Sequence, residues 1–362
     1  MRRKFLVGFL LVILALVISG CTVIGLPGSE QPIANDGGVY KSTDKGETLV
    51  SKVLVPTTTG TPAAINTVNV NKLLLDPQDS STIYLASNGQ NLFFSYDGAD
   101  SWLRPRERLN EMSVINDVAI DAKDSCHLYV AATNRIFKST NCGRTWKQIY
   151  ITDRAENNVY SVAVDFYNPN IVYAGTQVGD IMKSTDAGIS WQTIKRVSRD
   201  WGQEVIRILI DSQDTRRVYF ATKNAGLYKT TDAGNSWVEI NDQGALKDLP
   251  GAMDFKDLVQ DTTKRNSFIL VSNWGLLRTT DGGQTWQNIE LLSSTGKDKI
   301  LAVAIDPENS DGLYYCTDTI FVRSLDGGTS WISQNLPTSR ACSGLIIDPK
   351  NPKIVYMGVK QK

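Results

Sequence analysis

The chain has 362 residues, of which 41% are hydrophobic and 9% aromatic, a length and composition that suit one large folded domain. Its 38 basic residues balance its 38 acidic residues, so the formal net charge is zero. This balance argues against a general nucleic-acid-binding role and against a polybasic membrane-binding surface.

The first 20 residues predict a targeting segment and not a part of the fold. Residues 2–4 are basic, and residues 5–18 form an apolar run that is short for a membrane span. Residues 18–21, Ile-Ser-Gly-Cys, resemble a bacterial lipobox, in which the cysteine carries the lipid and becomes the mature N-terminus. We therefore expect lipidation at Cys21 and a place in the bacterial cell envelope, on the extracytoplasmic side of a membrane. The alternative is an ordinary cleavable signal with an incidental cysteine.

Residues 21–37 contain the cysteine and then a stretch with Gly, Pro, Ser and Asn and no apolar periodicity. Such a composition predicts a flexible tether, with a reach of about 20 Å by coil statistics. The three basic residues of the targeting segment would be lost on cleavage, which leaves the mature chain mildly acidic. The remaining residues, 38–362, form the third and largest region.

One motif, Ser/Thr-x-Asp-x-Gly-x-x-Trp, recurs along this region. Four complete copies begin at Ser184, Thr230, Thr279 and Ser324. Three copies, beginning at Ser42, Ser95 and Ser139, carry one change each: Leu49 for Trp, Ala99 for Gly and Asn141 for Asp. The first residues of the seven copies are 53, 44, 45, 46, 49 and 45 apart. A fixed period in this range predicts a propeller or solenoid array.

The chemistry of this box is that of a tight turn between two antiparallel strands. Asp and Ser side chains accept hydrogen bonds from nearby backbone N–H groups, and Gly supplies a positive φ. Seven equivalent copies are hard to reconcile with a unique catalytic or metal site. We therefore interpret the third residue of each box as structural: Asp44, Asp97, Asn141, Asp186, Asp232, Asp281 and Asp326.

A second repeat lies upstream of the boxes, an apolar run closed by Asp and then a short strand-like run, as in residues 162–165 and 171–175. Each unit thus contains four short strands, A to D, with the box between C and D. The repeats predict an all-β, seven-bladed β-propeller of four-stranded antiparallel blades. The consecutive apolar positions of strand A predict a strand that is buried on both faces. Strands C and D near residue 38 and strands A and B near the C-terminus would share one blade and close the ring.

Four cysteines remain besides Cys21. An exported protein can form disulfides. Cys126 in an A–B turn and Cys142 in the box of the same blade lie at one end of the sheet, which predicts a disulfide. Cys316 and Cys342 could pair between blades or could be separate buried residues, and the sequence leaves both open.

In such a blade the A–B and C–D turns lie on one face of the ring, and the B–C and D–A connections lie on the other. The second face is the more individual one, so we expect a binding site there. Three consecutive D–A connections are rich in arginine, which suits carboxylate or phosphate groups of a partner. The candidate residues are Arg104, Arg106, Arg108, Arg154, Arg196 and Arg199. The alternative is a solvated loop surface with internal ion pairs.

Two tryptophans lie outside the boxes, Trp201 in a D–A connection and Trp274 in a B–C loop. Exposed on that face, they could anchor a protein or stack on a sugar ring; alternatively each plugs a gap between blades.

The sequence contains few candidate catalytic residues. The one histidine, His127, is expected in a strand B, and no His/Cys cluster has metal-ligand spacing. A glycosidase needs two carboxylates at a fixed separation, and nothing in the sequence pairs candidates such as Glu107, Asp200 and Glu204. We expect no cofactor, no metal and no catalytic residue.

The box resembles the Asp-box, or BNR, repeat of sialidases, xyloglucanase-type glycoside hydrolases, sortilin-type receptors and photosystem II assembly and stability factors. The resemblance covers about Gly38 to Lys362. The assembly-factor family is the nearest in layout, because it implies a single seven-bladed ring, often exported, with an arginine-rich patch. The Phe-Arg-Ile-Pro segment of sialidases does not occur here.

These observations predict a lipid-anchored, non-catalytic, monomeric propeller that binds a protein partner or an assembling complex through the face opposite the boxes. The alternative is a glycan-binding protein or a glycoside hydrolase that uses the same face.

Overall fold

The computed structural model describes residues 35–58, 60–105, 114–197, 203–240, 245–249, 251–292, 296–297 and 299–362. The targeting segment, Cys21 and most of the tether lie outside these residues. Residues 34–362 form one compact unit. No helix within the described ranges has the length and apolar character needed to cross a membrane.

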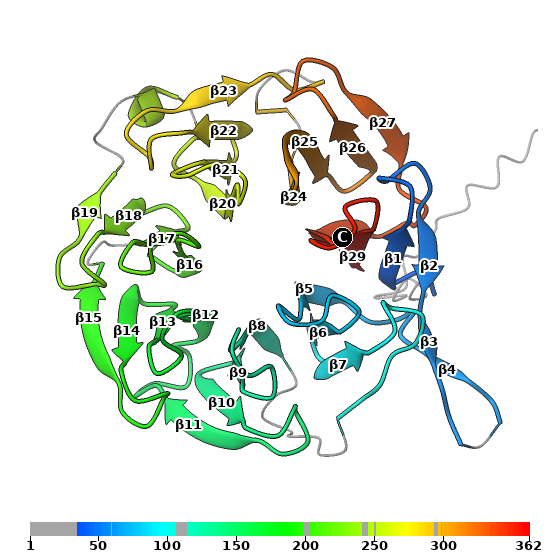
Figure 1. Cartoon of the computed structure of the whole chain (residues 1–362), viewed down its shortest axis with the longest axis horizontal. Coiled ribbons are helices and arrows are strands. Elements are labelled where there is room, and N and C mark those ends of the chain that lie inside the picture. The colour runs from blue at the N-terminus through cyan, green and yellow to red at the C-terminus, as the bar shows by residue number, and fades with distance from the viewer. Residues whose placement is uncertain are drawn as a thin grey trace, which may run out of the picture. The chain divides into compact units, whose positions relative to one another are not determined.

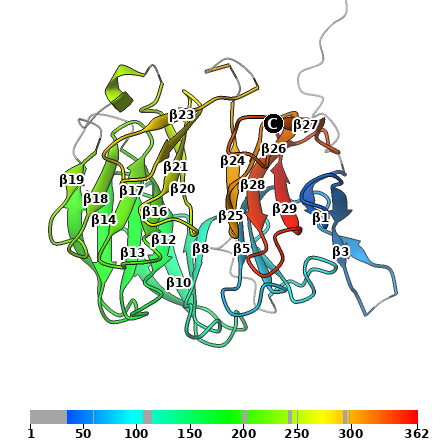
Figure 2. The same ribbon diagram turned by 45° about the horizontal axis from the view of Figure 1, so that its top comes forward.

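The described strands form seven blades around a central opening, as the sequence predicts (Figures 1 and 2). Blade 1 contains β28 (Ala341–Ile347), β29 (Val355–Lys360), β1 (Gly38–Ser42) and β2 (Val50–Lys52). Blade 2 contains β5 (Val70–Leu75), β6 (Ile83–Ser87) and β7 (Leu92–Ser95). Blade 3 contains β8 (Ile115–Ile120), β9 (Leu128–Ala132), β10 (Arg135–Ser139) and β11 (Lys147–Ile151). Blade 4 contains β12 (Val159–Val164), β13 (Val172–Thr176), β14 (Asp180–Ser184) and β15 (Gln192–Arg196).

The remaining three blades follow in chain order. Blade 5 contains β16 (Val205–Ile210), β17 (Val218–Thr222), β18 (Leu227–Thr230) and β19 (Val238–Glu239). Blade 6 contains β20 (Phe255–Gln260), β21 (Phe268–Ser272), β22 (Leu276–Thr279) and β23 (Gln287–Ile289). Blade 7 contains β24 (Ala302–Asp306), β25 (Asn309–Cys316), β26 (Ile320–Ser324) and β27 (Ile332–Asn335). In each blade strand A lies nearest the opening (Figure 1).

Blade 1 closes the ring with strands from both ends of the chain. Its strand order is β2-β1-β29-β28, and β1 pairs with β29 over five residue pairs, from Gly38 with Val359 to Ser42 with Val355. The pairing confirms the shared blade that the sequence predicts. It also covers strand edges that an open array would leave unpaired.

Two irregular spacings of the boxes correspond to insertions. The spacing of 53 residues accommodates a hairpin, β3 (Leu54–Val55) and β4 (Ala63–Ala64), which projects from the ring (Figures 1 and 2). The spacing of 49 residues accommodates the 3-10 helix η2 (Ala245–Asp248). Among the described residues of blade 2, a single bridge between Phe94 and Leu103 takes the place of a strand D.

The two faces of the ring have the connections that the sequence predicts. In the box of blade 4 the backbone N–H of Ala187 donates to the carbonyl of Asn170 in the A–B turn, at 2.8 Å. At the other end of the same blade Val197, after strand D, donates to Gly179 in the B–C loop, at 2.9 Å. We call the first face the box face and the second the loop face.

The core lies between blades and is made mainly by strand B. All five residues of β6, β9, β13, β17 and β21 are buried. The burial of strand A, which the sequence predicts throughout, varies between blades: all five residues of β24 are buried, whereas in β5 only Val70 and Leu73 are buried. Both faces of β5 pack against neighbouring blades, with Leu73 toward blade 1 and Leu74 toward blade 3, and the exposure comes from its free edge, which borders the central opening.

Candidate functional site

The strongest concentration of polar side chains around the opening lies where the inner strands begin, on the loop face. We call this group the collar: Asn71, Lys72, Asn116, Asp117, Arg207 and Asp257. The cavity that it lines has a volume of about 510 Å³. Two ion pairs hold the collar, Lys72 with Asp117 and Arg207 with Asp257, each at 3.4 Å.

A repeated backbone irregularity positions the collar. Six of the seven inner strands contain a one-residue bulge near their start. It is at the second position in five of them, as at Asn71 in β5 and at Tyr160 in β12, and at the third position, Ser343, in β28. A bulge redirects a side chain away from the ordinary alternation. The bulged Asn71 and Asn116 donate to backbone carbonyls of the following blade, at 3.0 and 2.8 Å. The collar is thus fixed to the scaffold and not carried on a mobile loop.

A hydrogen-bond chain links the collar across three blades. The Oδ2 atom of Asp117 accepts from the Oγ of Ser161 at 3.2 Å and from the N–H of Val162 at 3.1 Å. The same Ser161 Oγ accepts from the N–H of Ile208 in blade 5, at 3.0 Å. Asp117 is nearly fully buried, and its other oxygen, Oδ1, accepts from the N–H of Val118 at 3.0 Å and lies 3.4 Å from Lys72, so both oxygens have polar partners.

A smaller pocket adjoins the collar between blades 4, 5 and 6. We call it the Glu204 pocket; its volume is about 330 Å³ and its lining is Tyr160, Glu204, Ile206, Lys223, Phe255 and Lys256. Every one of these residues lies at the start of a strand A or in a B–C loop, and hence on the loop face. Glu204 is half-buried, and its Oε1 atom is 3.7 Å from the ammonium group of Lys223. Its Oε2 atom is buried and accepts no hydrogen bond from the described residues.

The predicted arginine sector is only partly visible. Arg106, Arg108, Arg199 and Trp201 lie outside the described residues. Arg104 is exposed, with its guanidinium 5.0 Å from the ring centroid of Phe93. Arg154 is exposed in its D–A connection.

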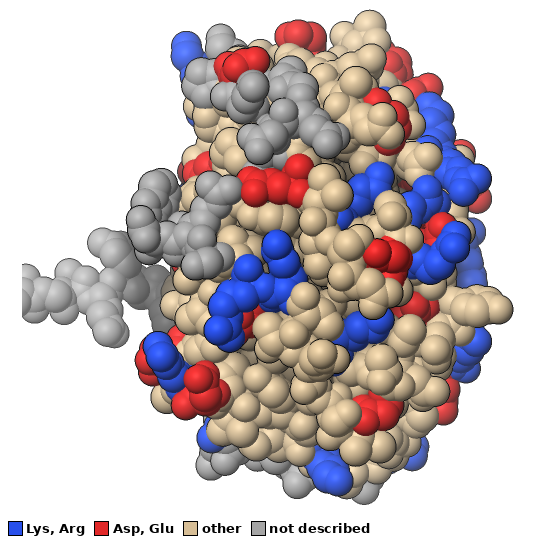
Figure 3. Space-filling model, turned by 90° about the vertical axis from the view of Figure 1, so that its left-hand side faces the viewer, with Lys and Arg blue, Asp and Glu red and all other residues tan. Residues whose placement is uncertain are grey.

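Arg196 is engaged within its own blade. Its Nε and Nη2 atoms donate to the two carboxylate oxygens of Asp180, at 2.5 and 3.1 Å. This bidentate pair raises the pKa of Arg196 further above its usual value. On the side of the ring shown in Figure 3, basic and acidic side chains are interspersed. Arg196 therefore fits the alternative of an internal ion pair.

Trp274 packs against the core between blades 5 and 6. Its Nε1 atom donates to the side chain of Asn288 at 3.1 Å, and its carbonyl accepts from Gly296 at 2.9 Å. These contacts fit the alternative of a residue that fills a gap in the scaffold.

The Ser, Thr, Asp and Asn side chains of the boxes form hydrogen bonds within their own turns. In blade 4 the Oγ of Ser184 accepts from the N–H of Gly188, and Asp186 accepts from both the N–H and the hydroxyl of Ser190. These hydrogen bonds lower the pKa of Asp186 to about 2. In blade 3 Asn141 takes the same place and donates its Nδ2 to Thr145. This geometry supports the structural interpretation of the third box position.

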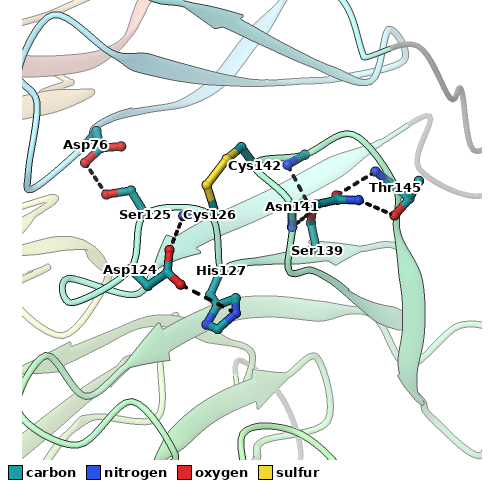
Figure 4. The surroundings of a disulfide bond; sticks show 10 residues. Asp76, Asp124, Ser125, Cys126, His127, Ser139, Asn141, Cys142 and Thr145 are labelled. Atoms are coloured by element: carbon teal, nitrogen blue, oxygen red, sulfur yellow. Dashed lines mark hydrogen bonds and ion pairs between the residues drawn. A yellow bond between two sulfur atoms is a disulfide. The ribbon is translucent and has the colours of Figure 1, made fainter.

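Both cysteine pairs are disulfides in the structure. Cys126–Cys142 joins the A–B turn of blade 3 to its box (Figure 4). Cys316–Cys342 joins blade 7 to blade 1, beside the closure of the ring. His127 lies in the A–B turn before β9 and not in strand B; its ring nitrogens are 3.6 Å from Asp121 and 3.8 Å from Asp124. Within the described ranges no group of three or more His, Cys, Asp or Glu side chains could hold a metal ion.

The collar was not predicted from the sequence, although the sequence contains a signal for it. The residue four positions before the closing Asp of each inner run is Lys72, Asp117, Ser161, Arg207 or Asp257 in blades 2 to 6. It is Ala302 and Gly344 in the other two blades. Polar residues at one fixed position of an otherwise apolar repeat indicate that this position lies at a shared polar region, here around the mouth of the central opening.

A family model described as photosynthesis system II assembly factor YCF48 matches residues 105–254. Among curated proteins, a xyloglucanase of Hypocrea jecorina is 26% identical over 141 residues, which is 38% of this chain and 16% of that protein. The chain therefore spans only a small part of this curated relative.

Solved structures share the fold at low sequence identity. The GH74 xyloglucanase from Xanthomonas campestris has a TM-score of 0.66 and 18% identity, over 81% of this chain and 51% of that one. YCF48 from Cyanidioschyzon merolae has a TM-score of 0.61 and 13% identity, over 84% and 97%. A structure of YCF48 bound to D1 peptide has a TM-score of 0.60 and 15% identity, over 85% and 95%.

The chain is a BNR-type β-propeller that resembles both groups. At identities of 13–18% the likeness to these solved structures concerns the fold alone. What distinguishes this propeller is therefore to be sought in its own collar and in the Glu204 pocket.

Proposed function

We propose that this propeller is a lipid-anchored protein of the bacterial envelope that binds a segment of a protein partner, without catalysis, at the collar on its loop face. The observation that carries the proposal is the convergence of charged and amide side chains around the 510 Å³ cavity. The bulges hold these groups in place, so a ligand would not need to order them. Preorganised polar groups of this kind lose little entropy on binding.

The box face supports the same assignment by contrast. Its Asp, Ser and Thr side chains satisfy one another and the turn backbone, as in the box that begins at Ser184. A surface of seven similar turns offers few distinctive groups to a partner.

The match of residues 105–254 to the YCF48 family model supports protein binding. The structure of YCF48 with D1 peptide names a peptide ligand for that protein, and the propeller aligns with 95% of it. The alignment with the xyloglucanase structure covers 51% of that chain.

Site-specific photo-cross-linking in cells tests the binding face. We would place a photoreactive amino acid at Lys72 in the collar and, as a control, at Thr231 in the box of blade 5. A single protein adduct from Lys72 that is absent from Thr231 is expected. Adducts from Thr231 alone would contradict the assignment of the loop face.

A charge variant tests the role of the collar. Arg207→Glu replaces the ion pair with Asp257 by two adjacent acidic groups and should abolish the Lys72 adduct, and a thermal melt checks that the variant is folded. The matched control is Arg216→Glu, because Arg216 is exposed on the box face. An unchanged adduct in Arg207→Glu would refute the collar as the binding site.

Lipid attachment is a separate part of the proposal, since Cys21 lies outside the described residues. Metabolic labelling with a palmitate analogue should mark the full chain and not the Cys21→Ser variant. Equal labelling of the full chain and of the Cys21→Ser variant would contradict lipid attachment at Cys21.

The second candidate function is glycan binding or hydrolysis, which the xyloglucanase match favours. A hydrolysis screen on xyloglucan and other polysaccharides separates the two. Cleavage that is lost in Glu204→Gln would replace the binder proposal.

A further inference from the structure

The Glu204 pocket contains a carboxylate whose hydrogen-bonding capacity is unused. Among the described residues no donor lies within hydrogen-bond distance of Glu204 Oε2, and the ammonium of Lys223 is 3.7 Å from Oε1. A buried acceptor without a donor is unfavourable, and more so when it is charged. Hydrogen bonds from a ligand to Glu204 would therefore contribute more binding free energy than the same bonds to an exposed carboxylate.

The cations around the pocket leave room for such a ligand. Lys256 is committed to Asp254, with 2.9 Å between Nζ and Oδ1. The side chain of Lys223 is 53% exposed, so it can turn into solvent when another cation approaches Glu204. The two acids Glu204 and Asp254 balance the charges of Lys223 and Lys256. The contact between Glu204 and Lys223 is the longer of the two ion pairs, and it is the one that a ligand would replace.

The walls of the pocket suit a flat cationic group. Tyr160 and Phe255 supply aromatic surface and Ile206 supplies aliphatic surface. A guanidinium stacks on aromatic rings and donates two parallel hydrogen bonds to a carboxylate. The Glu204 carboxylate, whose Oε2 accepts no hydrogen bond from the described residues and whose Oε1 is 3.7 Å from Lys223, is the complement of that fork.

We infer that the Glu204 pocket receives an arginine side chain of the partner segment, with the guanidinium on the Glu204 carboxylate and against Tyr160. This inference rests on the proposed function, because it assigns one residue of the segment that the collar binds. The adjoining positions of Tyr160, Ile206 and Lys256, which line both cavities, allow one extended segment to occupy the collar and the pocket together.

Titration calorimetry of the full chain with short peptides tests the inference without the natural partner. The probes are a capped glycine–arginine–glycine peptide and the same peptide with citrulline, which keeps the shape of arginine and lacks its charge. We expect the arginine peptide to bind at least about tenfold more tightly than the citrulline peptide, since charge-assisted bidentate bonds are the stronger kind. Equal affinity for the two peptides would overturn the inference.

Two variants with opposite expected effects sharpen the test. Glu204→Gln should remove the preference for arginine, whereas Lys223→Met should strengthen arginine binding because a competing cation is gone. The matched control is Glu156→Gln, since Glu156 is an exposed acid in another D–A connection of the loop face. Weaker binding in Lys223→Met would show that the pocket takes an anion or a sugar and would refute the inference.

The peptide-binding test of the Glu204 pocket and the cross-linking test of the collar can fail independently of each other. If the arginine preference is missing while the Lys72 adduct forms, the pocket assignment fails and the collar assignment stands. If the preference is present while no adduct forms from Lys72, the pocket is an arginine site and the proposed partner binding at the collar fails. Thermal melts of each variant establish that a loss of binding is not a loss of folding.

Discussion

The Nζ atom of Lys183, near the end of β14, donates a hydrogen bond of 2.7 Å to the carbonyl oxygen of Ala233 in the box of the next blade. Lys183 also lies over the ring of Tyr173, whose hydroxyl donates to the same carbonyl at 3.1 Å. The equivalent bond from Lys138 to Ala187 is 2.9 Å long. The basic residue before a box thus latches one blade to the next.

Removing one latch should destabilise the ring. Lys183→Met keeps most of the aliphatic stem and leaves the Ala233 carbonyl with the tyrosine bond alone, so we expect a loss of about 1–2 kcal/mol in the free energy of unfolding. Urea denaturation measures it. The matched control is Lys147→Met, an exposed lysine of β11, for which a change within about 0.5 kcal/mol is expected. Equal effects of the two variants would contradict the latch.

The boxes predict a loss of stability in acid. Hydrogen bonds to the carboxylates lower the pKa of Asp186, Asp232 and Asp326 to about 2, against an ordinary value of 3.8. A carboxyl whose pKa is lowered by folding contributes its stability above the unfolded pKa and loses it as the pH falls toward the folded one. Urea midpoints should therefore decrease between about pH 4 and pH 2.

A substitution in one box tests whether the titration of its carboxylate causes the loss of stability in acid. Asp186→Asn should fold, because Asn141 already fills the same place in blade 3, and its stability should depend less on pH in this window. If the parent and the variant lose stability equally between pH 4 and pH 2, the titration of the box is not the cause.

Closure of the ring by blade 1 predicts a global effect of a C-terminal deletion. Removal of residues 344–362 takes away β29 and most of β28, and with them the pairing of β1. The truncated chain should lose its single cooperative melting transition. A truncated protein that melts at the temperature of the full chain would contradict the shared blade.

The disulfide between Cys316 and Cys342 predicts a further contribution at the same seam. The double variant Cys316→Ser, Cys342→Ser should lose about 2–4 kcal/mol of unfolding free energy, because the unfolded chain is no longer cross-linked. Thiol counting in denaturant provides an independent check. Two reactive thiols more than in a chain with both disulfides would show that this pair is reduced.

Much of the fold followed from the sequence because each blade repeats local chemistry. The box at Ser184 is closed by contacts within seven residues, so its residues alone indicate the turn. The partial burial of strand A did not follow, because it depends on the radius of the ring. His127 was misplaced by one element because the turn before β9 ends one residue later than its pattern indicates.

For the candidate site too, some features follow from local sequence and others only from the tertiary structure. The sequence by itself determined the repeat, the blade count, the closure and the face on which connections vary, since these depend on local turns and on the alternation of strands. Only the tertiary structure decided that Arg196 is bound to Asp180 and that Glu204 faces Lys223 beside Tyr160. Asp180 and Arg196 are opposite each other in the β14–β15 hairpin, so the register of that hairpin brings them together. Tyr160 belongs to blade 4 and Lys223 to blade 5, and the curvature of the ring, which no single repeat encodes, sets their distances to Glu204.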